Sequence, residues 1–154
     1  MSWVLVEKGF EQCLVELEGW RTPSKQRPRW DPRRKSMYTP SETRMAEECI
    51  KAAWRQQVGY RRATHEGPIW AHVAVQRPLP PKVRKRDEGK PDLSTPDGDN
   101  TLKLVFDALN ELAYRDDRFI FKIEFEKMPR VPAGEPLRIF IRLDYYDSKE
   151  ERFL

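Results

Sequence analysis

Five aspartates surround one lysine in the stretch "PDGDNTLKLVFDALNELAYRDD", residues 96–117. Asp97 and Asp99 stand two residues apart in a glycine-containing turn, so both carboxylates can point at one spot. Carboxylates that meet repel one another unless a cation lies between them. Oxygen ligands that leave positions open for water suit Mg²⁺ or Mn²⁺. Such an ion can polarise a phosphodiester oxygen and orient a water molecule, so one prediction for this stretch is a hydrolytic metal site.

A simpler interpretation of the same residues stays open. Asp97 and Asp99 could cap the helix that follows and favour its positive end. Lys103 comes four residues after Asp99, and Asp107 four residues after Lys103, so the three lie about one turn apart on one helix. Three roles are therefore open for Asp107: a metal ligand, a partner of Lys103 or a surface charge on the helix. The spacing alone does not distinguish them.

The elements that must position these side chains have clear periodicities. A helix is expected from residue 100 onward, with one apolar stripe formed by Leu102, Val105, Phe106, Leu109 and Leu112. A strand over 118–127 places four apolar residues on one face, namely Phe119, Phe121, Ile123 and Phe125. Asp116 and Asp117 precede this strand, so the return from helix to strand can bring them beside Asp99. A second strand over 136–145 alternates in the same way through Leu137, Ile139, Ile141 and Leu143. The short connection between these two strands predicts that they are antiparallel neighbours.

The first half of the chain is expected to contribute a strand through Cys13, Val15 and Leu17, then a long irregular loop over residues 20–40. A helix should begin at Ser41, with a buried stripe formed by Met45, Ala46, Cys49, Ile50, Ala53 and Trp54. A strand at 68–75 and a proline-rich irregular loop at 77–96 follow. The prediction is an α+β fold in one compact domain spanning 1–154, with a mixed sheet of about four strands and two principal helices.

Composition narrows the class of protein. Of 154 residues 35% are charged, yet five Trp, five Tyr and seven Phe argue against a disordered chain. Cys13 and Cys49 match no zinc spacing and lie in apolar patterns, so we expect two reduced core thiols. The first apolar run is followed at once by Glu7, and no run approaches the length of a membrane span. A soluble cytoplasmic protein is expected.

The acidic stretch, together with "FEKMP" and "PLRIFIRL", resembles the RusA family of Holliday-junction resolvases. That family shows an Asp-x-Asp-Asn turn, a Lys four residues after the second Asp, an Asp-Ala-Leu segment and an Asp-Asp pair that opens a strand. A Lys-Met-Pro often closes that strand. Each of these elements occurs here in order over residues 96–129, and a weaker agreement extends over most of the chain.

The resemblance implies residue roles. Asp97, Asp99 and Asp117 would be the catalytic carboxylates that hold Mg²⁺, for which Mn²⁺ would substitute, and Lys103 the essential basic residue. Asp92 competes with Asp97 for the first role, but only Asp97 keeps the Asp-x-Asp-Asn spacing. The chain departs from the family pattern at Phe119, where Gln is usual, and at Glu111, where Gly is usual. Both departures lie beside the acidic residues, so they bear on substrate detail.

Two basic segments flank this region. Residues 20–38 carry Trp20, Trp30 and Tyr38 among basic side chains that include Arg29, Arg33, Arg34 and Lys35. A second cluster leads into the acidic turn and contains Lys82, Arg84, Lys85 and Arg86. Basic residues neutralise phosphates, and aromatic rings stack on unpaired bases. We therefore expect both segments to contact DNA; the alternative is that they are solvated loops without a partner role. Lys127 is either a further phosphate contact or a surface lysine. Neither His65 nor His72 has a spacing that would make a ligand pair, and His72 is expected to be structural.

The expected function is therefore that of a Mg²⁺-dependent endonuclease that resolves four-way DNA junctions by paired symmetric nicks. The alternative is a branched-DNA-binding module of the same fold with little or no catalysis. The resemblance implies a homodimer, and a two-fold dimer suits a junction because it presents two equivalent sites. The apolar faces of the late strands could form its interface or the core of the monomer. The family is frequently encoded by phages.

Overall fold

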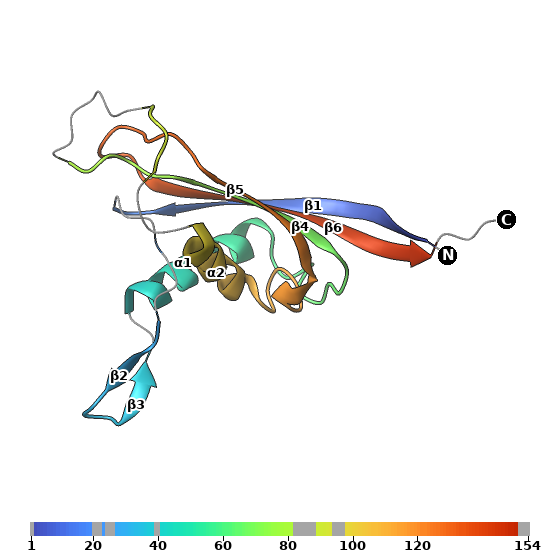
Figure 1. Cartoon of the computed structure of the whole chain (residues 1–154), viewed down its shortest axis with the longest axis horizontal. Helices are drawn as coiled ribbons and strands as arrows, with labels where there is room; N and C mark the ends of the chain where they lie inside the picture. The colour runs from blue at the N-terminus through green and yellow to red at the C-terminus, as the bar shows by residue number, and fades with distance from the viewer. Residues whose placement is uncertain are drawn as a thin grey trace.

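The computed structural model of the chain describes residues 2–19, 23, 27–38, 41–81, 89–93 and 98–150. These residues form a four-stranded sheet, a separate two-stranded hairpin and two α-helices, and Figure 1 shows both helices on one side of the sheet. In chain order the elements are β1 (Trp3–Leu17), β2 (Arg29–Asp31), β3 (Ser36–Tyr38), α1 (Ser41–Gln57), β4 (Ile69–Gln76), α2 (Gly98–Leu109), the short 3-10 helix η2 (Asp117–Phe119), β5 (Ile120–Lys127) and β6 (Leu137–Glu150). The predicted α+β class is confirmed.

The four-stranded sheet has the order β1-β6-β4-β5. Strand β6 pairs antiparallel with both β1 and β4, whereas β4 and β5 are parallel. A parallel pair needs a crossover connection, and the segment between β4 and β5 supplies it with α2, which lies on the helix-covered side. The sheet is mixed, as predicted.

The predicted hairpin of the two late strands is wrong. Strand β4 lies between β5 and β6, since Ala71 is in register with Ile123 on one side and with Leu143 on the other. The connecting residues pass the end of β4 instead, where the Met128 amide donates to the Val75 carbonyl at 2.8 Å. Alternation of apolar and polar residues indicates that a segment is a strand, but it does not show which strand pairs with it. The prediction of pairing depended on the short connection between β5 and β6, and that length did not determine the pairing.

The core lies between the sheet and the two helices. Alternate residues of β4 and β6 are buried on this side, namely Ile69, Ala71, Val73, Val75, Leu137, Ile139, Ile141, Leu143 and Tyr145. The predicted apolar face of β6 is therefore part of the core of the single chain. Two tyrosine hydroxyls tie the residues after α2 to this core, because Tyr114 donates to the Phe106 carbonyl at 2.8 Å and Tyr145 to the Ala113 carbonyl at 2.7 Å.

Helix α1 begins at the predicted residue, but its buried stripe is narrower than expected. Ala46, Ile50 and Trp54 are buried at a spacing of four, while Met45 is 69% exposed and Cys49 is exposed. Met45 and Cys49 start one residue earlier, about 100° around the helix, so their row faces solvent. Cys49 is therefore not a core residue. Cys13 is buried, as predicted, and burial raises the pKa of its thiol to about 12.

Strand β5 is an edge strand, and the helices cover its apolar face only in part. Phe121 is 53% exposed and Ile123 46% exposed, while Phe125 packs partly buried beneath the start of α2. The alternation predicted this strand correctly. The sequence left open whether this apolar face lies in an interface or in the core: Phe119 and Phe125 pack partly buried against the core, whereas Phe121 and Ile123 stay exposed.

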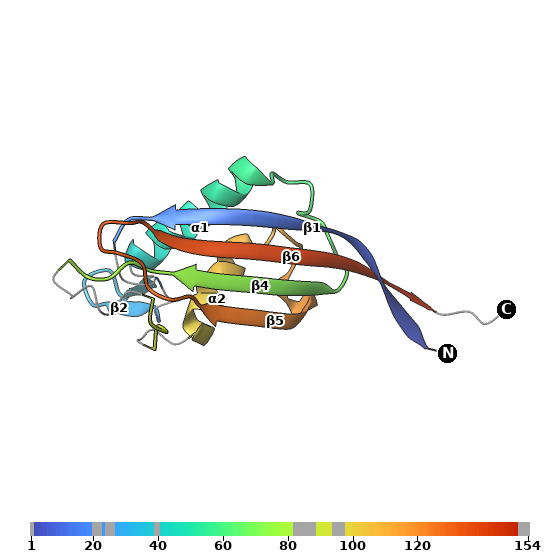
Figure 2. The ribbon, with the colours of Figure 1, turned by 90° about the horizontal axis from the view of Figure 1, so that it is seen from above.

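Strand β1 begins well before the predicted strand. Its first residues, Trp3–Glu7, pair with 146–150 of β6, beyond the last pair between β4 and β6. Figure 2 shows the resulting two-stranded arm extending past the rest of the sheet. Neither helix of the described chain is long and apolar enough to cross a membrane.

Candidate active site and DNA-contact surface

The first turn of α2 carries Asp99, an exposed side chain. The helix can begin here only because residue 98 has no side chain: a Cβ on Gly98 would lie 2.6 Å from the Phe125 ring. The glycine thus lets the helix start pack flush on β5. Lys103 is exposed one turn further along, and half-buried Asp107 follows. Asp97 lies outside the described residues.

Asp116 and Asp117 open the second acidic segment. The Asp116 carboxylate accepts from the Arg118 amide at 2.9 Å and caps η2, and this bond lowers the pKa of Asp116. Burial raises the pKa of Asp117, and its hydrogen bond to Asp116 and the charges of Asp116 and Asp107 raise it further. The fold therefore places Asp107 and Asp116 within electrostatic reach of Asp117, and a cation would relieve the repulsion among these charges.

The two acidic segments lie at opposite ends of α2 within one chain. Asp99 and Asp107 are separated by about 12 Å along the helix axis, given a rise of 1.5 Å per residue. The Asp117 amide donates to the Asn110 side-chain oxygen at 3.0 Å, just past the end of α2. The return from helix to strand thus brings Asp117 beside Asp107, not beside Asp99. Within the described residues, no three His, Cys, Asp or Glu side chains gather closely enough to hold a metal ion.

Asp92 is committed to a different contact. Its carboxylate receives two bonds from Arg77, Nε to Oδ2 at 2.5 Å and one terminal nitrogen to Oδ1 at 2.9 Å. Both side chains are almost fully buried, 6% exposed for Arg77 and 5% for Asp92. The same segment is tied at Gly89, whose amide donates to the Arg130 carbonyl at 3.0 Å. Asp92 therefore anchors the chain that leads to the acidic turn, which leaves Asp97 as the candidate for the first catalytic position.

The predicted irregular loop at 20–40 contains the β2–β3 hairpin. Its turn is held by Asp31, whose Oδ1 accepts from the Arg33 amide at 2.9 Å and from the Arg34 amide at 3.4 Å. The hairpin carries the four basic side chains of this segment that were predicted to contact DNA, and all four are exposed, namely Arg29, Arg33, Arg34 and Lys35. The chain that leads into the hairpin is fixed to α2, since the buried Thr101 hydroxyl donates to the Pro23 carbonyl at 3.3 Å. The hairpin begins at Arg29, six residues after this contact, and Thr101 lies two residues after Asp99 in α2.

A family model described as "Endodeoxyribonuclease RusA" matches residues 21–144. The chain belongs to the RusA family of endodeoxyribonucleases. The matched range contains the hairpin, both helices and the whole acidic stretch, so the resemblance seen in the sequence is confirmed. The uncharacterized protein YqaN of Bacillus subtilis (strain 168) is 36% identical over 77 residues, which is 42% of this chain and 54% of that protein. The chain therefore matches about half the length of this relative.

The other basic residues of this RusA-family chain that were predicted to contact DNA fall into two groups. Lys82, Arg84, Lys85 and Arg86 lie outside the described residues. Lys127 is half-buried at the end of β5, two residues after the Phe125 ring that supports the start of α2. Of the predicted DNA contacts, the four on the hairpin are therefore the ones that the structure describes as exposed.

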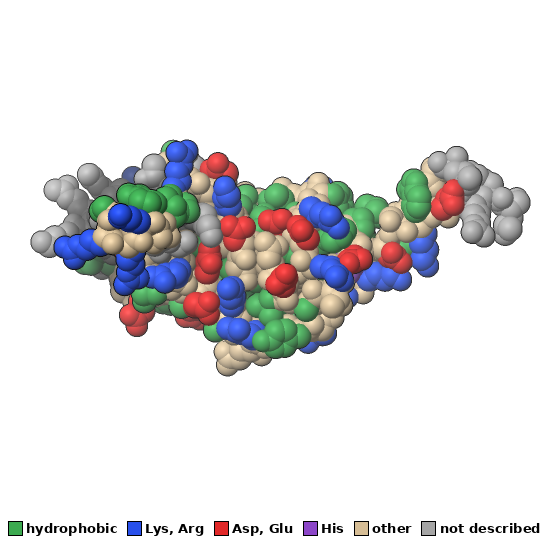
Figure 3. Space-filling view, turned by 90° about the horizontal axis from the view of Figure 1, so that it is seen from below, with side chains coloured by type: hydrophobic (Ala, Val, Ile, Leu, Met, Phe, Trp, Pro, Cys, Tyr) green, Lys and Arg blue, Asp and Glu red, His purple; other side chains and the backbone are tan. Residues whose placement is uncertain are grey.

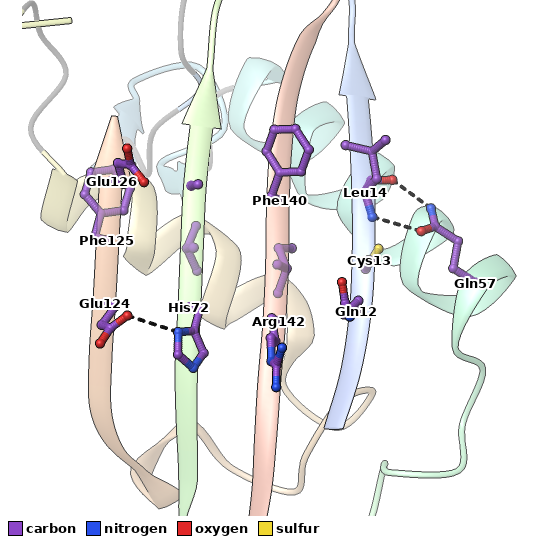
Figure 4. Close-up of a pocket in the computed structure, with 13 residues that line it drawn as sticks. Gln12, Cys13, Leu14, Gln57, His72, Glu124, Phe125, Glu126, Phe140 and Arg142 are labelled. Atoms are coloured by element: carbon purple, nitrogen blue, oxygen red, sulfur yellow. Dashed lines mark hydrogen bonds and ion pairs between the residues drawn. The ribbon is translucent and has the colours of Figure 1, made fainter. Parts of the chain in front are cut away.

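The sequence interpretation missed a polar network on the uncovered face of the sheet. His72 Nε2 lies 2.8 Å from Asp144 Oδ2, and its Nδ1 lies 3.2 Å from Glu124 Oε2. Arg142 also donates to Asp144, at 3.1 Å. A shallow hollow of about 710 Å³ opens here, and Figure 4 shows the side chains of β1, β4, β5 and β6 around it. His72 links three strands, and only the alternation of polar residues along β4–β6 hinted at this face.

Proposed function

We propose that this RusA-family chain is a Mg²⁺-dependent endonuclease that resolves four-way DNA junctions by paired, symmetric nicks. The observation that carries the proposal is the family match over residues 21–144, which includes Asp97, Asp99, Lys103 and Asp117 at the family spacing. The exposed basic hairpin supports a polymeric DNA substrate, because it offers further phosphate contacts on a segment whose entering chain is fixed to the first turn of α2.

The residues present suit a divalent cation. Asp99 is an exposed carboxylate, and the charge of Asp117 is made costly by burial and then by its acidic neighbours. Asp97, Asp99 and Asp117 would hold Mg²⁺ or Mn²⁺, which supplies Lewis-acid stabilisation of phosphate charge and a more acidic water. Lys103, exposed one turn after Asp99, stabilises negative charge that develops on the phosphate. Asn110 holds the Asp117 backbone in place through its side-chain oxygen.

The separation of Asp99 and Asp117 along α2 bears on oligomeric state. Carboxylates at the two ends of one helix cannot share an ion within the chain as described. A two-fold homodimer can join them, with Asp97 and Asp99 from one copy and Asp117 from the other, and it forms two such sites at once. The proposal therefore includes a homodimer, in which each site is completed by both copies.

A cleavage assay tests the activity. With Mg²⁺, the purified chain should cut a synthetic four-way junction by paired nicks and leave the matching linear duplex almost untouched. Asp99→Asn and Lys103→Ala should each lower the rate by at least about 100-fold while junction binding persists. Lys149→Ala, on the projecting arm, is the control that should cut normally. Equal cutting of duplex and junction would reduce the claim to a general nuclease, and tight junction binding without cutting in Mg²⁺ or Mn²⁺ would favour the binding module.

A subunit-mixing experiment tests the composite site. Inactive Asp99→Asn and Asp117→Asn variants are unfolded together, refolded and assayed. If each site draws on both copies, the mixed dimer has one site with both substitutions and one intact site, so single nicks should reappear. If each site lies within one copy, every site in the mixture carries a substitution and no activity returns. Asp99→Asn refolded alone is the matched control.

A further inference from the structure

We propose that the β2–β3 hairpin recognises the branch point of DNA, with Trp30 stacking on a base that the junction leaves open. The inference rests on the proposed function in taking branched DNA as the partner. It adds a residue that discriminates branched from linear DNA, at a place distinct from the acidic residues. The argument depends on the exposure of two apolar side chains, on the charges beside them and on where the hairpin joins the domain.

The hairpin displays apolar side chains without a core beneath them. Trp30 and Met37 are directly opposite one another in the antiparallel pair, and they are 56% and 59% exposed. The hairpin is separate from the four-stranded sheet and projects away from it (Figure 1). A two-stranded hairpin is marginally stable by itself in water. Exposing an indole and a thioether side by side on such an element adds little to folding, and large exposed apolar groups indicate a binding surface.

The positive charges around Trp30 and Met37 favour a polyanion as the partner. Arg29, Arg33, Arg34 and Lys35 are exposed on the same short hairpin. Its acidic residue, Asp31, is engaged in holding the turn and lies 3.9 Å from the Arg34 Nε. Seen from the helix side, Lys and Arg side chains crowd this end of the molecule around apolar ones (Figure 3). Cations next to an exposed aromatic ring are typical of nucleic-acid surfaces, where phosphates meet the cations and bases meet the ring.

The ring can act only where the bases are accessible. In an intact duplex each base is stacked on both sides, so insertion of an indole costs the unstacking of a base step. At the centre of a four-way junction the stacks are interrupted, and a side chain can cover a base at lower cost. Trp30 should therefore strengthen binding to branched DNA and contribute little to linear duplex, whereas the arginines should strengthen both.

The hairpin is also in the right place to act with the acidic residues. The contact between the Thr101 hydroxyl and the Pro23 carbonyl fixes the entering chain beside the first turn of α2, two residues from Asp99. The hairpin begins six residues after Pro23, so DNA that extends several nucleotides from phosphates held near Asp99 can reach it. By contrast, the exposed Trp3, at 69%, lies on the arm at the opposite end of the molecule (Figure 2).

The test measures binding in Ca²⁺, without cleavage, on a junction that carries 2-aminopurine at its centre. Binding of the unaltered protein should change the 2-aminopurine emission. Trp30→Ala should abolish that change and weaken junction binding by about 5- to 150-fold, the range for loss of one base-aromatic stack. Its affinity for linear duplex should stay within about twofold. Trp30→Phe should retain most of the junction affinity, and Trp3→Ala should behave as the unaltered protein.

Each outcome separates the two proposals. Unchanged junction binding by Trp30→Ala, or an equal loss on junction and duplex, would overturn the role of Trp30 and leave the nuclease intact if cutting persists. A Trp30-dependent emission change in a protein that cuts no DNA in Mg²⁺ would support branch-point recognition while overturning the nuclease. Circular dichroism of Trp30→Ala confirms that the domain is folded, so a loss of binding reports the missing ring.

Discussion

Arg77 and Asp92 form a two-bond ion pair inside the protein, with Nε and Oδ2 2.5 Å apart and both side chains at least 94% buried. Arg77 follows β4, and Asp92 precedes the acidic turn. The pair therefore joins the end of a core strand to the segment that delivers Asp97 and Asp99. Removing Arg77 would take both of these charge-assisted bonds away from a carboxylate that is buried in the protein.

We therefore expect Arg77→Met to lower the free energy of unfolding by about 3–5 kcal/mol, measured by urea denaturation. The double variant Arg77→Met/Asp92→Leu should recover a large part of this loss, because neither charge then remains in the core. Asp92→Asn tests the catalytic alternative for this residue. Its cleavage rate per folded molecule should stay near that of the unaltered protein, and a loss comparable to Asp99→Asn would show that Asp92 acts in the reaction.

The two cysteines should differ in reactivity. Cys49 is exposed on α1, whereas Cys13 is buried and the pKa of its thiol is raised to about 12. A thiol reagent such as dithionitrobenzoate should label one group quickly in the native protein and the second only in denaturant, since the thiolate is the reactive form. Cys49→Ser should abolish the fast phase. A fast phase that persists in this variant would mean that Cys13 is accessible.

Asp117 should reduce stability at neutral pH. Burial and the neighbouring Asp116 raise its folded-state pKa above the ordinary value of an aspartate, so the folded state binds the proton more tightly than the unfolded state. The favourable contribution is present below the unfolded pKa and is lost as pH rises through the folded pKa. Asp117→Asn should therefore raise the melting temperature at pH 7, while the difference should shrink toward pH 3. A lower melting temperature at pH 7 would show that the charge of Asp117 stabilises the fold.

The hairpin arginines should contribute to the salt dependence of DNA binding. Each phosphate contact that is lost lowers the slope of log K against log salt by about 0.9 on duplex DNA. Arg33→Ala/Arg34→Ala should therefore flatten the slope by up to about 2 on both junction and duplex DNA. Lys8→Ala/Lys149→Ala removes the same charge from the arm and should leave the slope unchanged. Equal effects of the two double variants would indicate a general electrostatic contribution.

The local patterns of the sequence predicted most elements of the fold. Alternation in β5 and β6 and the helical spacing in α1 and α2 depend on a few neighbouring residues, and each element was found close to its predicted range. The acidic stretch and its family resemblance are also local properties, and the match over residues 21–144 confirms the family. The hairpin at 29–38 escaped prediction because its strands are three residues long and lack a buried face.

The arrangement of these elements was decided only by long-range packing. Strand β6 pairs with β1 and β4, and β5 with β4, although the short connection between β5 and β6 predicted a hairpin. His72 contacts Asp144, 72 positions away, and Arg77 contacts Asp92 across the core. Asp99 and Asp117 share a motif in sequence, yet they lie near opposite ends of α2, Asp99 in its first turn and Asp117 at Asn110 just past its last residue. Spacing along a chain specifies which residues share a helix or a strand, whereas the burial of apolar faces against one another determines which distant residues meet.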